Sequence, residues 1–216
     1  STELSFVYDD TDLAIKKLPS WAKHKRVRPN PLTLPSKSYL VPEPLGTCLV
    51  IGAWNYPYNI SLVPLIAAMA AGNTVILKPS EIPSATSALM ARLINDNFPA
   101  EYMYVVEGGI PETTALLEER FDKIFFTGST TVGRIVYEAA AKHLTPVTLE
   151  MGGKSPAIVT KDTNLMGAAK RIVFGKFLNG GQTCIAPDYV VVDKVVKEEF
   201  MEHLKACIQR FDYSFA

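Results

Sequence analysis

The sequence has 216 residues, and its 22 Lys and Arg residues balance its 22 Asp and Glu residues. Because nucleic acids and anionic membranes attract strongly basic surfaces, this zero net charge argues against both as partners. Hydrophobic residues make up 48% of the chain and charged residues 20%, which favours a globular fold over disorder.

The first 44 residues carry little periodic pattern. We expect one or two helical turns around residues 10–18, ending at Pro19, because proline is unfavourable inside a helix. Five prolines follow between Val27 and Pro44, and proline cannot donate to a strand ladder. This segment is predicted to be an excursion from the main body, with at most edge strands or a hairpin.

From Gly46 to Glu150 the sequence alternates between short apolar runs and helical segments. The predicted strands are 46–53, 74–78, 102–107, 123–127 and 146–150, and the predicted helices are 61–71, 84–97, 112–119 and 130–142. Their short linkers imply right-handed βαβ crossovers. The predicted fold class is therefore α/β, with a doubly wound, five-stranded, parallel Rossmann-like sheet.

The regular alternation of short strands and helices ends after Gly153. This change predicts a domain boundary between residues 1–151 and 152–216. The second part is predicted to contain strand 155–159, helix 164–178, a polar loop at 179–183, strand 189–192 and helix 195–210. We interpret it as the beginning of a second α/β lobe.

Polar residues and glycines follow the predicted strands, at the edge where open parallel sheets bind ligands. In chain order, from the first predicted strand to the fifth, they are Asn55; Lys78 and Glu81; Gly108 and Gly109; Gly128, Ser129 and Thr130; and Glu150. Strand ends commonly carry turn residues, so a turn-forming role explains the glycines and Ser129 as well as a ligand-binding role does. Lys, Glu and Asn directly after buried strands favour a ligand-binding role.

Residues 127–133 follow a strand and open a helix, which favours anion binding by the helix N-terminus. The segment lacks the G-x-G-x-x-G fingerprint, and Arg134 and Ile135 stand where a Walker A loop needs Lys and Ser or Thr. These departures exclude a nucleoside-triphosphate hydrolase.

Glu150 follows the glycine-rich turn at a spacing that suits a ribose ligand. The glycines that follow Glu150 also let its carboxylate reach a cleft, so both roles stay open.

The three cysteines are far apart and odd in number, which fits reduced thiols in a cytoplasmic compartment. Cys48 and Cys207 lie in apolar patterns typical of a core. Cys184 lies in an irregular polar loop, and a nucleophilic role there requires a neighbour that stabilises or generates the thiolate. The three histidines show no zinc-ligand spacing, so we expect no metal site.

Five motifs occur in an order that resembles the NAD(P)-dependent aldehyde dehydrogenases. They are residues 52–57 (GAWNYP), 77–81 (LKPSE), 126–130 (FTGST), 149–154 (LEMGGK) and 181–184 (GQTC). The flanking residues 109–120 and 141–149 look most like the class 3 branch, which includes fatty-aldehyde dehydrogenases. The resemblance runs from about Leu13 to Phe211.

The resemblance implies a thioester route from an aldehyde to a carboxylate. Cys184 would be the nucleophile, and the Asn55 amide with the Cys184 backbone N–H would hold the oxyanion. Hydride would pass to NAD or NADP, and Glu150 would then act as general base for hydrolysis instead of as a ribose ligand. Residues 1–151 would be the NAD(P)-binding domain and residues 152–216 a partial catalytic domain.

The implied cofactor residues are Lys78 and Glu81 at the adenosine ribose, Gly128 and Ser129 beside the pyrophosphate, and Trp54 in the cofactor wall. Glu81 favours a free 2′-hydroxyl whereas Lys78 tolerates a 2′-phosphate, so the choice between NAD and NADP stays open.

The resemblance also implies a homodimer in the full-length form, paired through the proline-rich excursion. Family enzymes are considerably longer and carry an E-x-F-G-P segment that this sequence lacks, and the chain begins with Ser1 instead of Met. We therefore expect a partial chain. The alternative to an enzyme is a non-catalytic module that binds NAD(P) or another subunit.

Overall fold

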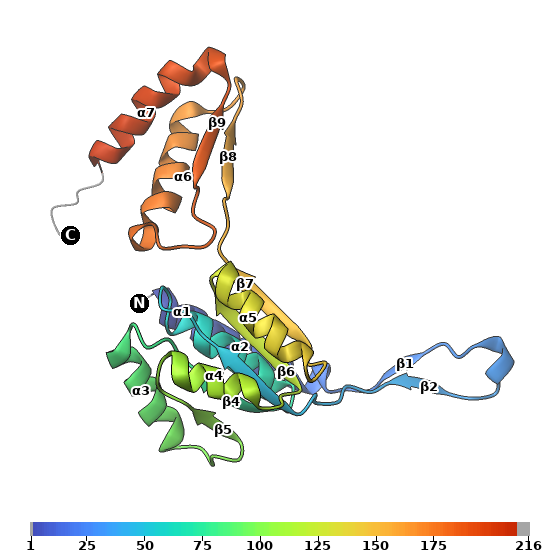
Figure 1. Ribbon diagram of the computed structural model, residues 1–216. Coiled ribbons are helices and arrows are strands. Elements are labelled where there is room, and N and C mark those ends of the chain that lie inside the picture. Colours follow the sequence, from blue (N-terminus) through green and yellow to red (C-terminus); the bar gives the residue numbers. More distant parts are fainter. Residues whose placement is uncertain (1, 211–216) are drawn as a thin grey trace. The chain divides into compact units, whose positions relative to one another are not determined.

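The computed structural model describes residues 2–210, and the chain divides into two compact units (Figure 1). The first unit comprises Ser1–Glu150 and the second comprises Met151–Ala216. Within the described residues, no helix combines the length and the hydrophobicity needed to cross a membrane.

A five-stranded parallel sheet forms the centre of the first unit and confirms the predicted fold class. Its strands are β3 (Thr47–Ile51), β4 (Thr74–Lys78), β5 (Met103–Val105), β6 (Lys123–Gly128) and β7 (Val147–Met151). Their order is β5-β4-β3-β6-β7, so the chain first builds outward from β3 on one side and then crosses over to build on the other. The register pairs Ile51 of β3 with Lys78 of β4 and with Phe126 of β6.

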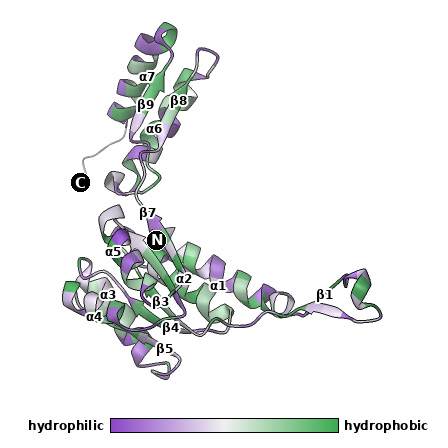
Figure 2. Cartoon of the chain, turned by 45° about the vertical axis from the view of Figure 1, so that its right-hand side comes forward, coloured by the Kyte–Doolittle hydropathy of each residue, from purple (hydrophilic) through white to green (hydrophobic). Residues whose placement is uncertain are grey.

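Helices cover both faces of this sheet, as the alternating pattern predicts. Helices α2 (Asn59–Ala70) and α3 (Ser84–Asn95) pack on the face that carries Val50, Val75 and Leu77. Helices α4 (Ile110–Glu118) and α5 (Thr130–Ala141) pack on the face that carries Leu49 and Phe126. Helix α2 and the central strands are largely hydrophobic (Figure 2) because they are covered on more than one side.

The N-terminal helix is much longer than the sequence pattern predicts. Helix α1 spans Thr2–Trp21 and includes Pro19, so the prediction of one or two turns ending at Pro19 was wrong. Pro19 lies in the last turn, where it removes only one helical hydrogen bond, and Ala22 N–H still donates to the Leu18 carbonyl at 2.9 Å. Packing against α2 stabilises the helix, and that packing leaves no clear trace in the local sequence.

The proline-rich excursion is a two-stranded antiparallel hairpin, as predicted. Strand β1 (Lys25–Val27) pairs with β2 (Ser38–Leu40), and a short 3-10 helix, η1 (Pro31–Thr33), lies between them. The prolines fall outside the paired residues, which is why the ladder is only three residues long.

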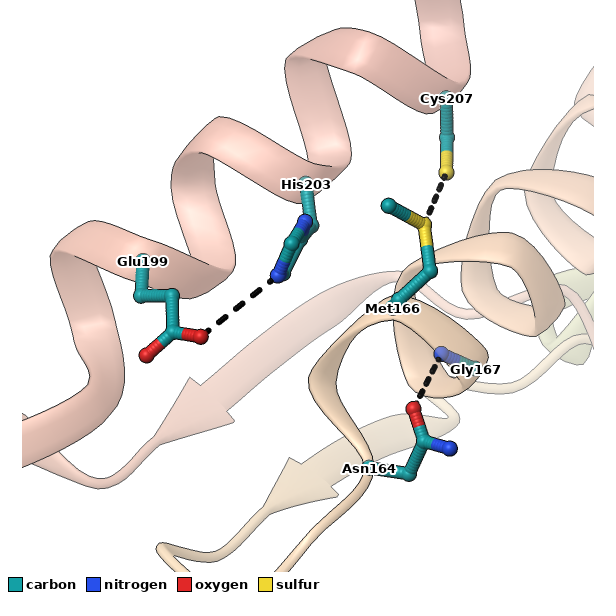
Figure 3. A network of polar contacts seen from close by, with 6 residues as sticks. All are labelled: Asn164, Met166, Gly167, Glu199, His203 and Cys207. Atoms are coloured by element: carbon teal, nitrogen blue, oxygen red, sulfur yellow. Dashed lines mark hydrogen bonds and ion pairs between the residues drawn. The ribbon is translucent and has the colours of Figure 1, made fainter.

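The second unit has a two-stranded parallel sheet packed against two helices. Its elements are β8 (Pro156–Val159), α6 (Leu165–Phe177), η2 (Leu178–Gly181), β9 (Tyr189–Val192), η3 (Lys194–Val196) and α7 (Lys197–Arg210). Cys207 is buried between α6 and α7, where its thiol lies 4.0 Å from the Met166 sulfur (Figure 3). Cys48 is likewise buried in β3, and burial raises the pKa of its thiol. Both cysteines are core residues, as predicted.

Asn73 fixes the turn that brings the chain from α2 into β4. Its side-chain oxygen accepts hydrogen bonds from Leu45 N–H (2.7 Å) and Gly46 N–H (3.0 Å), and its amide donates to the Ala68 carbonyl (3.0 Å). The side chain therefore joins the entry of β3 to the end of α2.

Replacing Asn73 by Ala should lower the free energy of unfolding by about 2 to 4 kcal/mol, because two backbone N–H groups lose their acceptor in a largely buried place. Urea denaturation of the wild type and the variant measures the difference. Asn97→Ala is the control, because the side-chain amide of exposed Asn97 donates to the Leu93 carbonyl of the preceding turn and holds no distant segment. Equal losses in the two variants would contradict the assignment.

Candidate active site at the carboxyl edge of the sheet

The ends of four adjacent strands gather most of the candidate residues along one edge of the first unit. Lys78 ends β4, Trp54 and Asn55 follow β3, and Gly128 ends β6. Glu150 lies in β7, one residue before its end. The strand order reverses between β3 and β6, and doubly wound sheets bind their ligands at such a switch point.

Lys78 is a buried cation at this edge. The residue is only 2% exposed, and its ammonium donates a hydrogen bond to the Pro79 carbonyl at 2.7 Å. Burial lowers the pKa of Lys78, and the nearby carboxylates of Glu81 and Glu112 oppose that shift. The hydrogen bond to the Pro79 carbonyl uses one of the three donor protons of the ammonium group.

A small cavity of about 120 Å³ lies beside Lys78, between the ends of β4 and β5. Its lining residues are Pro79, Ser80, Glu81, Ser84, Ser87, Glu107 and Gly108. The Ser87 hydroxyl donates to the Ser80 carbonyl at 2.6 Å, which fixes the segment after β4 against α3. Glu81 is exposed, and its side chain passes close to Gly109. The cavity thus combines two carboxylates, those of Glu81 and Glu107, with hydroxyl groups, which suits a hydroxylated ligand.

The sequence analysis missed Glu112, which lies in the first turn of α4. Its carboxylate accepts a hydrogen bond from Gly109 N–H at 2.7 Å. This hydrogen bonding to the backbone N–H groups of Glu112 and Gly109, together with the Lys78 charge, lowers the pKa of the Glu112 carboxyl. A Glu three residues after a glycine that precedes a helix is a capping signal, and it was available in the sequence.

Helix α5 begins at the switch point with Ser129 as its N-cap. The Ser129 hydroxyl accepts a hydrogen bond from Val132 N–H at 3.2 Å. Gly128 packs against the ring of Phe126, where a Cβ atom would collide with the ring. The glycine therefore has a packing role, and the helix N-terminus beside it has the dipole that favours a phosphate.

The loop from β3 to α2 carries Trp54, which is 43% exposed, and the half-buried Asn55. Gly52 N–H at the start of this loop donates to the Lys78 carbonyl at 3.0 Å. Gly52 also lies so close to the Ser61 hydroxyl that a Cβ atom would not fit there. The loop that carries Asn55 is thus tied to the strand end that carries Lys78.

Cys184 lies in the second unit with an exposed, free thiol. The preceding turn contains three residues in the left-handed region, Asn179 (φ 53°), Gly180 (φ 63°) and Gly181 (φ 81°). Gly153 packs against the Cys184 carbonyl, where a Cβ atom would lie 3.2 Å from that oxygen. The Cys184 loop therefore has a specific backbone path.

Other contacts bind the flanks of this loop within the second unit. Asp188 N–H donates to the Ser155 carbonyl at 3.1 Å, and Lys154 pairs with the Asp188 carboxylate at 3.1 Å. Because Asn55 and Glu150 belong to the first unit, their proximity to Cys184 stays a prediction.

The described residues contain no group of three or more side chains suited to hold a metal ion.

Replacing Glu112 by Gln should lower the melting temperature above pH 5, and the difference from the wild type should shrink as the pH falls below 4.5. The carboxyl pKa is below its ordinary value of 4.5 in the folded protein, so its stabilising effect is fully present above pH 4.5 and decreases progressively as the pH falls below that value through the folded-state pKa. Thermal melts from pH 3 to 7 test this, with Glu118→Gln on the same helix as the control. A loss that is independent of pH would contradict it.

The sequence model of the aldehyde dehydrogenase family matches residues 3–214. The chain is 51% identical over 209 residues to the rat aldehyde dehydrogenase described as dimeric and NADP-preferring, which covers 97% of this chain and 46% of that protein. It is 47% identical to aldehyde dehydrogenase family 3 member A2 of Pongo abelii, over 98% of this chain and 44% of that protein.

The structure of Staphylococcus aureus AldH in its substrate-bound state superposes with a TM-score of 0.95 at 48% identity, over 97% of this chain and 46% of that chain. The chain thus spans about half the length of the relatives it matches. On these similarities, which extend over nearly all of its residues, the chain belongs to the aldehyde dehydrogenase family.

Proposed function

We propose that this protein oxidises aldehydes to carboxylates with NAD or NADP as the hydride acceptor. The observation that carries the proposal is the carboxyl edge of the sheet, where buried Lys78 and the Glu81 cavity at the ends of β4 and β5 share one edge with the N-terminus of α5 after β6. Cys184, Asn55 and Glu150 supply a thiol, an amide donor and a carboxylate, which are the three groups that a thioester route needs.

Each of the three groups has one proposed role. The Cys184 thiolate attacks the aldehyde carbonyl carbon, and the Asn55 amide and the Cys184 backbone N–H stabilise the oxyanion that forms. Collapse of this thiohemiacetal expels hydride and leaves a thioester on Cys184. The Glu150 carboxylate then takes a proton from the water that hydrolyses the thioester, which releases the carboxylate product and restores the thiol.

The first unit fits an NAD(P) molecule by the chemistry of its donors. Lys78 and Glu81 are proposed to hold the adenosine ribose, Gly128 and Ser129 to lie beside the pyrophosphate, and Trp54 to form part of the cofactor wall. The bound nicotinamide supplies the site for the hydride. Glu81 favours a free 2′-hydroxyl whereas Lys78 tolerates a 2′-phosphate, so we propose that the site accepts NAD or NADP.

Further proposals concern the substrate, the assembly and the compartment. Similarity to the class 3 branch supports a hydrophobic aldehyde as substrate. The rat relative is described as dimeric, and the exposed edge of the β1–β2 hairpin offers a surface for pairing subunits in a homodimer. Three free cysteines support a cytoplasmic location.

A second candidate function is that of a non-catalytic module that binds NAD(P). The favouring observation is that all the proposed cofactor residues lie in the unit Ser1–Glu150, whereas the proposed nucleophile lies in the other unit. Cofactor binding without aldehyde turnover would favour this candidate.

The purified protein should reduce NAD or NADP when a long-chain or aromatic aldehyde is added, and Cys184→Ser should abolish this activity. Absorbance at the wavelength of the reduced cofactor measures the rate. The buried thiol variant Cys207→Ser is a control, because it removes a cysteine that has no proposed role in the reaction. Activity that persists in Cys184→Ser would overturn the proposal.

In the Glu150→Gln variant, we expect a thioester to accumulate on Cys184 after one turnover, because acylation needs no general base at Glu150 and hydrolysis does. Mass spectrometry of the intact protein measures the added acyl mass after brief exposure to aldehyde and cofactor. The exposed residue Glu138 on α5 provides the matched control, Glu138→Gln, which should turn over as the wild type does. Rapid turnover of Glu150→Gln without accumulation would refute the base assignment.

A further inference from the structure

Glu3 links two helices at the proposed active-site edge. It lies in the first turn of α1, and its carboxylate accepts hydrogen bonds from Tyr58 N–H at 3.0 Å and from Asn59 N–H at 3.2 Å. Those two N–H groups belong to the start of α2 and lie more than 50 residues away in the sequence. A single oxygen atom of Glu3 thus serves two backbone donors of another helix.

Helix α2 has no cap of its own. The N-cap residue, Tyr58, has helical torsion angles (φ −75°, ψ −52°), and its side chain makes no capping hydrogen bond. The first N–H groups of a helix have no partner within that helix, so they need an outside acceptor. A carboxylate suits this place because it both accepts the hydrogen bonds and complements the positive end of the helix dipole.

The same contact fixes one end of the loop that carries Asn55. At its other end, the loop from Gly52 to Pro57 is held by the hydrogen bond from Gly52 N–H to the Lys78 carbonyl at 3.0 Å. Asn55 is three residues before Tyr58, so the start of α2 sets the backbone position of Asn55. A donor that is displaced by about 1 Å from a developing charge can lose up to about 100-fold in rate.

We propose that Glu3 is a positioning residue that holds the Asn55 loop in the geometry that oxyanion stabilisation requires. The inference rests on the proposed function, because it assigns the oxyanion contact to Asn55. In this proposal Glu3 acts through the backbone N–H groups of Tyr58 and Asn59, to which its carboxylate is bonded.

Hydrogen exchange tests the structural part of this inference without any activity. In Glu3→Ala, the amides of Tyr58 and Asn59 lose their acceptor, so peptides that cover residues 54–62 should exchange about tenfold faster or more. Glu3→Gln keeps one side-chain oxygen as an acceptor and should restore most of the protection. Asp9→Asn is the matched control, because Asp9 is an exposed carboxylate on the same helix.

Kinetics of the same variants test the catalytic part. Glu3→Ala should lower kcat/KM for the aldehyde about tenfold, in the direction of Asn55→Ala, and should leave the dissociation constant of NAD(P) within about twofold of the wild type. Glu3→Gln should recover most of kcat/KM. If Glu3→Ala does not fold, Glu3→Asp makes the same comparison, because it keeps the charge and shortens the reach by one methylene group.

The outcomes separate this inference from the proposed function. Unchanged exchange in residues 54–62, an unchanged kcat/KM in Glu3→Ala, or a loss shared by Asp9→Asn would each overturn the role of Glu3. If the wild-type protein reduces no cofactor with any aldehyde, the proposed function fails. The exchange measurement then decides by itself whether Glu3 holds the loop.

Discussion

Parallel pairing of the strands is the constraint on which the rest of the first unit depends. Because β3, β4 and β6 run in the same direction, their carboxyl ends meet at one edge, and residues that are far apart in sequence become neighbours there. Covering both faces with helices buries the strands and leaves this edge as the place where polar groups can gather. The proposed cofactor site is a consequence of this topology.

Polar groups at that edge need compensation, and the structure provides it locally. Buried Lys78 bonds the Pro79 carbonyl and has two carboxylates nearby, which offset part of the cost of burying its charge. The Glu112 carboxylate accepts a hydrogen bond at the start of α4, and the Glu3 carboxylate accepts one at the start of α2. Acidic side chains thus hold the loops around the site by accepting hydrogen bonds from helix N-termini.

Close approach of backbone segments explains several glycines of the motifs. Gly52 packs on Ser61, Gly128 packs on Phe126, and Gly153 packs on the Cys184 carbonyl. Each of these glycines fixes the path of a segment that carries, or lies beside, a proposed functional residue. The motifs therefore contain two kinds of residue. Some supply the side chains proposed for the chemistry, and the glycines allow the close backbone packing that places those side chains.

The sequence by itself determined the α/β class, the five strands of the sheet and the hairpin, because buried strands, amphipathic helices and proline-rich segments have local signatures. It also determined the family, through five ordered motifs. Only the tertiary structure decided the full length of α1, since packing on α2 outweighs the local effect of Pro19, and only it showed that Glu3 caps α2. Contacts across more than 50 residues depend on how the helices pack, and no periodic pattern within either segment encodes them.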